Sequence, residues 1–234
     1  MTTYMAPIRD MLFAMNELAG LAEIVALPGN EEATPDLVEA ILNEAAKFAT
    51  EVLAPINAQG DRQGCKCKDG AVTTADGFKE AYSKFIESGW NAMPASPEFG
   101  GQGLPSLVST PVLEMWKASN LAFSLCQMLT LGAVAAIAHH GSERDKHVYL
   151  PRMVSGVWTG TMNLTEPQAG SDLSAVRTKA EPEGDHYRIS GTKIFITWAS
   201  TTWQKTLSIW CLRAYPTRPR ERRVFRCSSC QSSS

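Results

Sequence analysis

The 234-residue sequence lacks an apolar run as long as the ~18 residues that a membrane span requires, so we expect no membrane partner. Its N-terminus, Met1–Tyr4, lacks the basic stretch followed by an apolar segment that marks a secretory leader. Six cysteines are too few for a disulfide framework in a chain of this length. Together these absences favour a reduced compartment and predict a cytoplasmic location.

Acidic residues are scarce at the end of the chain. Residues 198–234 contain seven basic side chains and one acidic side chain, whereas residues 1–197 contain 15 basic and 23 acidic ones. The basic run Arg218–Arg223 could contact nucleic-acid phosphates, but no aromatic residue or recognised fold accompanies it. A solvated or accidental basic run explains it better, and we expect no nucleic-acid partner.

Helical patterns fill the first 156 residues. Thr34, Pro35 and Asp36 predict a helix start, because a hydroxyl cap, a proline and an acid are each favoured there. Behind them an apolar stripe is expected to face the core until Pro55 limits the helix, with the members Leu37, Ile41, Ala45, Phe48 and Val52. Other helices are predicted over residues 8–21 and 76–88, twice within 106–140, and from a cap at Ser142 to Met153.

The period changes after Gly156. Strands are predicted over Trp158–Leu164, Ala175–Ala180 and Tyr187–Thr197, with a turn at Pro182–Asp185 between the last two. The fold class is therefore α+β. An all-α helical domain at residues 1–156 precedes the beginning of a β domain at residues 157–197.

The segment Met162–Asp172 leaves a predicted strand and enters a loop. Thr165 and Ser171 supply hydroxyls, Gly170 permits close approach of a ligand, and the exposed N–H groups of such a loop can bind an anion. From these residues alone, a polar turn without a ligand is the better interpretation.

Three motifs in one order change that interpretation. Over residues 1–197 the sequence resembles the acyl-CoA dehydrogenase family. The resemblance rests on the segments Met162–Asp172, Ser96–Gly103 and Lys193–Thr197. The family's signatures are a Thr-Glu strand end with a Gly-Ser-Asp loop, a Pro-Glu-x-Gly-Gly-x-Gly element and a second flavin strand. The extension Tyr4–Asp10 is similar to that of a bacterial subgroup, the 3-methylmercaptopropionyl-CoA dehydrogenase-like enzymes.

The resemblance implies that FAD is held between the β domain and the helical domains. It places Ser171 against both the FAD pyrophosphate and the acyl-CoA. Two residues depart from the family pattern, since Asn163 replaces a small residue and Phe195 replaces a tryptophan. The implied cofactor-binding residues are Met162, Leu164, Thr165, Gly170, Ser171, Phe195, Ile196 and Thr197.

The resemblance further implies α,β-dehydrogenation of an acyl-CoA thioester in fatty acid metabolism, with an electron-transfer flavoprotein or similar acceptor and a homo-oligomeric assembly. The family's glutamate base lies in a C-terminal helical bundle that this sequence lacks. We therefore assign no catalytic residue and expect an inactive, truncated fragment. Alternatives are a non-catalytic flavin- or CoA-binding remnant and a DNA-associated flavoprotein of the alkylation-response branch.

Residues 198–234 are interpreted as a shifted reading frame and are expected to be disordered. Permitted codons for Trp198–Lys205, with one inserted G, translate to a sequence resembling the subgroup, and the codons of Phe225–Ser234 yield a strand pattern in the same frame. Zinc binding by Cys227 and Cys230 with Cys65 and Cys67 is an alternative, but no further ligand spacing supports it, and we expect no metal.

Overall fold

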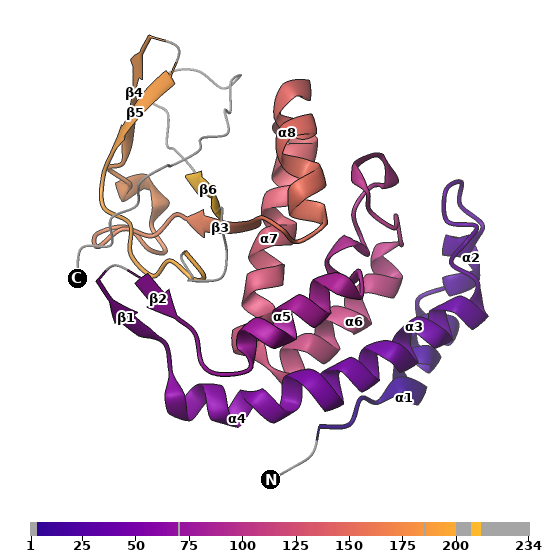
Figure 1. Ribbon diagram of the computed structural model, residues 1–234. Coiled ribbons are helices and arrows are strands. Elements are labelled where there is room, and N and C mark those ends of the chain that lie inside the picture. Colours follow the sequence, from indigo (N-terminus) through magenta and orange to yellow (C-terminus); the bar gives the residue numbers. More distant parts are fainter. Residues whose placement is uncertain (1–3, 70, 185, 200–206, 212–234) are drawn as a thin grey trace.

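The computed structural model describes residues 4–69, 71–184, 186–199 and 207–211. Most of the chain before residue 155 is helical, and short strands follow from residue 159, so the predicted α+β order is confirmed (Figure 1). The α-helices are α1 (Ile8–Phe13), α2 (Leu21–Val25), α3 (Pro35–Phe48), α4 (Ala54–Gln63), α5 (Phe78–Glu87), α6 (Ser106–Ser119), α7 (Leu121–His140) and α8 (Glu143–Val154). The strands are β1 (Lys66–Lys68), β2 (Ala71–Thr73), β3 (Thr159–Asn163), β4 (Lys179–Glu183), β5 (His186–Ser190) and β6 (Leu207–Cys211).

Two helices begin at the caps that the sequence predicts. The Thr34 hydroxyl accepts a hydrogen bond from the N–H of Leu37 at 3.4 Å, and Pro35 lies in the first turn of α3. The Ser142 hydroxyl accepts from the N–H of Asp145 at 3.2 Å at the start of α8. Each cap satisfies an N–H group that has no partner within its own helix.

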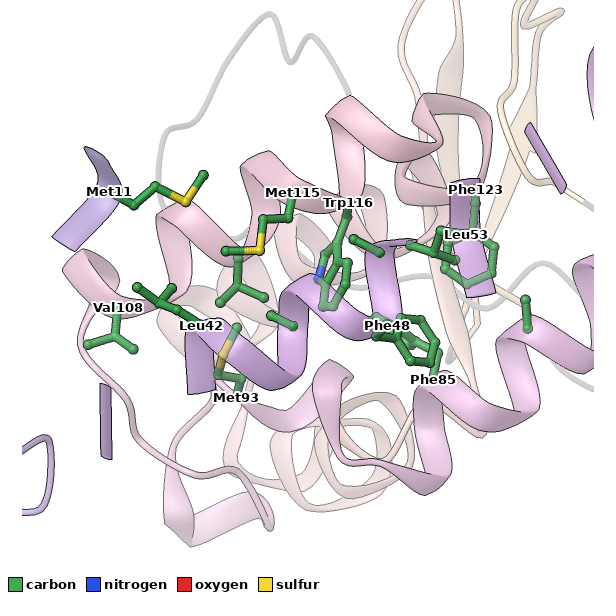
Figure 2. Packing of buried hydrophobic residues seen from close by; sticks show 14 of the residues in the cluster. Met11, Leu42, Phe48, Leu53, Phe85, Met93, Val108, Met115, Trp116 and Phe123 are labelled. Carbon is green, nitrogen blue, oxygen red and sulfur yellow. The ribbon is translucent and has the colours of Figure 1, made fainter. Parts of the chain in front are cut away.

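The core of the helical part surrounds the fully buried Trp116 (Figure 2). The Phe48 ring lies 5.3 Å from the Trp116 ring at 77°, an edge-to-face geometry that aromatic rings favour. The face of α3 that enters this core is rotated from the predicted stripe. Val38 and Leu42 are fully buried, whereas Leu37 is 41% exposed.

The expectation that Pro55 ends the helix is wrong. After α3 the chain forms a π-helical turn, Ala49–Leu53, and α4 then begins at Ala54 with Pro55 in its first turn. The missing N–H of a proline breaks no helical hydrogen bond at that position. The hairpin of β1 and β2 was not predicted, because strands of three residues are too short to show a period.

Helix α7 corrects the expectation about apolar runs. It has 20 residues, an 18-residue stretch of it has a mean hydropathy of 1.9, and by length and composition alone it could cross a membrane. A core helix meets the same criterion, and α7 packs against α6, α8 and β3. The N–H of Gly160 in β3 donates to the Thr130 hydroxyl of α7 at 3.1 Å, and a Cβ on Gly160 would lie 2.5 Å from that of Ala133. Strand β3 therefore rests directly on α7.

The strands form three two-stranded sheets within the described residues. The β1–β2 hairpin is antiparallel. Strand β3 pairs in parallel with β6, from Thr159 opposite Leu207 to Asn163 opposite Cys211. Strands β4 and β5 are antiparallel. The parallel pair brings a segment from beyond the helical part into register with the strand that lies on α7.

The second and third predicted strands are wrong in part. A 3-10 turn, Leu173–Ala175, stands where the second was expected to begin, and β4 starts at Lys179 and includes Pro182. The third ends at Ser190, and residues 191–197 form no regular strand. The next residue, Gly191, has φ of 154°, and a Cβ added there would lie 2.3 Å from the Thr178 hydroxyl. A residue with a side chain would therefore be strained at the point where the chain leaves the β4–β5 hairpin.

The expected disorder from residue 198 onwards is wrong at two places. Trp198 packs against the helical core, and residues 207–211 form β6. A large indole gains by packing against apolar residues, and the open edge of β3 can pair with another strand. The sequence pattern of the tail indicates neither contact. The remaining tail, including Arg218–Arg223 and Cys227, lies outside the described residues. The reading-frame interpretation stays a prediction, and sequencing the gene across the Thr197 codon tests it.

Candidate flavin site

Two segments far apart in sequence run side by side in opposite directions. The Thr161 hydroxyl donates to the carbonyl of Thr197 at 2.6 Å, and the N–H of Ile194 donates to the carbonyl of Thr165 at 3.0 Å. We call residues 161–166 the first segment and residues 193–197 the second segment. These bonds bring together six of the eight residues that the resemblance assigned to the cofactor.

The first segment presents alternate side chains to opposite sides. Thr161 and Asn163 are buried, whereas Met162 is 49% exposed. These three residues belong to strand β3, and their alternation follows from the period of two in a strand. Leu164 and Thr165 are half-buried beyond the strand end.

The second segment exposes an aromatic ring in a strained conformation. Phe195 is 85% exposed and has φ of 58°, a left-handed conformation that costs an L residue about 1–2 kcal/mol. Ile196 and Thr197 beside it are half-buried. Strained backbone conformations cluster at active sites and where ligands are held.

A tight turn separates the first segment from the loop that carries Gly170 and Ser171. Glu166 and Ala169 exchange backbone hydrogen bonds of 2.9 and 3.0 Å across this turn. Both loop residues are exposed, and among the described residues no atom lies within 4 Å of a Cβ added to Gly170. No hydrogen bond among the described residues joins Gly170 or Ser171 to the second segment, so the contact that brings the other six predicted residues together does not include these two.

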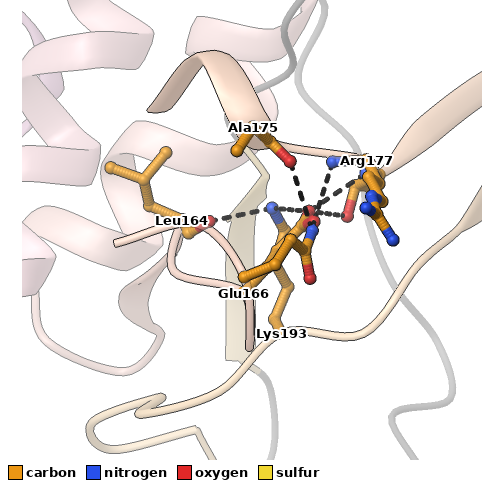
Figure 3. A network of polar contacts seen from close by, with 7 residues as sticks. Leu164, Glu166, Ala175, Arg177 and Lys193 are labelled. Atoms are coloured by element: carbon orange, nitrogen blue, oxygen red, sulfur yellow. Dashed lines mark hydrogen bonds and ion pairs between the residues drawn. The ribbon is translucent and has the colours of Figure 1, made fainter. Parts of the chain in front are cut away.

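The carboxylate of Glu166 lies at the centre of a polar network that sequence analysis missed (Figure 3). One oxygen, Oε1, accepts from Lys193 Nζ at 2.8 Å, from the N–H of Thr178 at 3.0 Å and from the Thr178 hydroxyl. The other, Oε2, accepts from the N–H of Arg177 at 2.8 Å and from the Gln168 amide at 2.6 Å. Lys193 first, then the Thr178 hydroxyl and the N–H groups of Arg177 and Thr178, hold the pKa of the Glu166 carboxyl far below its ordinary value.

Lys193 joins this network to the first segment. Its Nζ also donates to the carbonyl of Leu164 at 2.9 Å, and the side chains of Lys193 and Glu166 are only 10% and 2% exposed. The sequence did show an acid two residues after the predicted strand Trp158–Leu164 and a lysine at the start of the second flavin motif. Their separation of 27 residues gave no indication that they pair.

No metal centre is found in the part of the chain that the structure describes, where no three His, Cys, Asp or Glu side chains are grouped. Cys65 and Cys67 are exposed free thiols. Cys227 and Cys230, the other half of the zinc alternative, lie outside the described residues.

Sequence profiles agree with the two parts of the fold. The profile of the acyl-CoA dehydrogenase N-terminal domain matches residues 35–157, and that of the middle domain matches residues 161–224. The second match extends beyond residue 197, so the resemblance is not confined to residues 1–197.

Individual relatives support the same family. The chain is 43% identical over 196 residues to 3-methylmercaptopropionyl-CoA dehydrogenase of Ruegeria pomeroyi, a match that covers 83% of this chain and 33% of the relative. The fold is similar to butyryl-CoA dehydrogenase of Megasphaera elsdenii, with a TM-score of 0.63, 24% identity and coverage of 77% and 45%. An FAD complex of PigA gives a TM-score of 0.59 at 26% identity, with coverage of 74% and 43%.

The chain thus spans about a third of the length of the curated relative and less than half of either solved structure. Within that span, one profile covers more than half of the chain and the other follows it in the order of the two structural parts. The chain therefore belongs to the acyl-CoA dehydrogenase family.

Proposed function

We propose that this chain contributes the helical N-terminal part and the first flavin-contacting segments of an FAD-dependent acyl-CoA dehydrogenase. The observation that carries the proposal is the antiparallel contact between the first and second segments, made at Thr161–Thr197 and Thr165–Ile194. It gathers at one place the residues that the family resemblance assigns to the isoalloxazine ring.

The residues present suit such a ligand. Met162 and Phe195 offer exposed apolar surface for a flat ring, and the hydroxyls of Thr165 and Thr197 lie beside them in sequence. The nearby carboxylate of Glu166 is paired with Lys193 and adds no uncompensated negative charge. The space around Gly170 is open, since a Cβ added there would meet no described neighbour within 4 Å. A phosphate therefore has room to approach the backbone at this position.

FAD bound here would supply the hydride acceptor for oxidation of the bond between Cα and Cβ of an acyl-CoA thioester. The residues of this chain would bind and orient it. By the resemblance, Met162, Leu164 and Thr165 contact the ring, while Ser171 contacts the pyrophosphate and the substrate.

The same resemblance places the glutamate base on a C-terminal helical domain. We accordingly expect residues 1–234 alone to show no turnover with any acyl-CoA. An electron-transfer flavoprotein as acceptor, a homo-oligomeric assembly and a cytoplasmic location belong to the proposal for the whole protein.

Titration of FAD into purified residues 1–234, followed by flavin fluorescence, tests the proposal. We expect saturable quenching that riboflavin, which lacks the pyrophosphate and adenosine, does not reproduce at the same concentration. The variant Phe195→Ser should weaken the quenching, and its folding should be little affected because the ring is exposed. A linear, unsaturable response from the unmodified chain would overturn the proposal.

A further inference from the structure

The pair Glu166–Lys193 has no assigned role in the function proposed above. We propose that the two side chains are positioning residues, a clasp that fixes the geometry of the flavin-contacting segments. This inference rests on the proposed function and adds two residues to it.

Lys193 connects the two segments directly. Its Nζ donates at once to the carbonyl of Leu164 and to the carboxylate of Glu166, at 2.9 and 2.8 Å. In the next residue along the chain, the N–H of Ile194 donates to the carbonyl of Thr165. One ammonium group therefore fixes the register in which Phe195 and Thr197 meet the first segment.

Glu166 closes the loop that carries the other predicted residues. The loop of residues 167–176 leaves Glu166 and returns at Arg177, whose N–H donates to the same carboxylate that Lys193 pairs with. The Thr178 N–H and hydroxyl add two further donors. The clasp thereby sets the ends of the loop with Gly170 and Ser171 as well as the register of the second segment.

The energetics favour a geometric role over a stabilising one. A buried ion pair is often no more stabilising than an apolar pair of similar volume, because both charges lose their hydration. Apolar side chains could hold these segments together but would not fix the direction of the Leu164 carbonyl. Lys193 Nζ does so by donating to that carbonyl. The Glu166 carboxylate, on which five donors converge, holds the ammonium group in place.

The test compares FAD binding of the 234-residue chain with that of Lys193→Met, Glu166→Gln and the double variant. Lys193→Met should bind FAD at least about tenfold more weakly, equivalent to about 1.4 kcal/mol, and should change the visible absorption spectrum of the bound flavin. The double variant should bind no more weakly than Lys193→Met, because it also removes the carboxylate that would be left unpaired. Thr178→Val keeps both charges and should give the same spectral change to a smaller extent.

Leu42→Ala is the matched control for lost stability. Leu42 is fully buried in α3, on the helical side of the molecule (Figure 1). We expect a lower melting temperature but an unchanged FAD affinity and flavin spectrum at temperatures where the variant is folded. Amide exchange at Ile194 gives a readout without FAD, and it should become faster in Lys193→Met.

The outcomes separate the two proposals. If the unmodified chain shows no saturable FAD binding, the proposed function fails and the clasp fails with it. If the unmodified chain binds FAD but Lys193→Met has the same affinity and spectrum, or changes only as Leu42→Ala does, the clasp alone is overturned.

Discussion

The indole N–H of Trp198 donates to the carbonyl of Ala122, 76 residues earlier, at a distance of 2.9 Å. The indole also stacks on the Phe78 ring at 6.4 Å and 28°. These contacts tie the end of the second segment to the start of α7 and to α5. Since β3 rests on α7 as well, α7 contacts both β3, which leads into the first segment, and Trp198, which follows the second segment.

We expect Trp198→Phe to keep the stacking and lose the hydrogen bond, at a cost of about 1 kcal/mol in the free energy of unfolding. Trp198→Ala removes both contacts and should cost about 3 kcal/mol. Urea unfolding followed by far-ultraviolet circular dichroism measures both. Leu18→Ala, at an exposed position in the helical part, is the control and should change stability by less than about 0.5 kcal/mol.

Two glycines of the family motifs should differ in how much stability is lost when alanine replaces them. In Gly101→Ala the new Cβ would lie 2.0 Å from the carbonyl oxygen of Ala95, so the backbone must move and the chain should lose stability. Gly170→Ala meets no described neighbour within 4 Å and should leave the melting temperature unchanged. If a phosphate approaches Gly170, the same substitution should weaken FAD binding. Equal FAD affinity in Gly170→Ala and the unmodified chain would remove this loop from the site.

The Glu166 network predicts an acid-sensitive β region. Lys193, the Thr178 hydroxyl, and the N–H groups of Arg177 and Thr178 donate to the carboxylate, and they hold its pKa below the ordinary 4.5. The network therefore contributes fully to stability above that ordinary value, and the contribution is lost as the pH falls from there towards the lowered pKa of the folded state. We expect the acid-unfolding midpoint to lie at higher pH in Lys193→Met, measured by circular dichroism across a pH series. An unchanged midpoint would contradict the assignment of Lys193 as the main partner.

The start of a helix could be predicted where residues of its own first turn determine it. Thr34, Pro35 and Ser142 act within one helical turn, and the helices start where these residues indicate. Pro55 misled the prediction because the same residue type can end a helix or occupy its first turn, and the π-helical turn before it decides which.

Non-local pairing set the limit of the site prediction. The two segments could be identified because each carries a family motif, but their contact depends on tertiary structure. Glu166 pairs with Lys193 across 27 residues, and β3 pairs with β6 across a stretch that contains a separate hairpin. Neither period nor propensity encodes such partners.

The hydroxyls of the two segments allow a prediction that separates binding from folding. No hydrogen bond between described residues uses the side-chain hydroxyl of Thr165 or of Thr197, whereas that of Thr161 donates to the Thr197 carbonyl at 2.6 Å. Thr165→Val and Thr197→Val should therefore change the free energy of unfolding by less than about 0.5 kcal/mol. Each should weaken FAD binding by about tenfold if its hydroxyl contacts the flavin.

Thr161→Val is the matched control for these two variants. It removes a buried hydroxyl that joins the segments and should cost about 1–2 kcal/mol in the free energy of unfolding. Its effect on FAD binding should follow from the loosened contact between the segments, so affinity and stability fall together. Titration of FAD and urea unfolding on all three variants give the comparison. If Thr165→Val and Thr197→Val bind FAD as tightly as the unmodified chain, the flavin does not contact these hydroxyls.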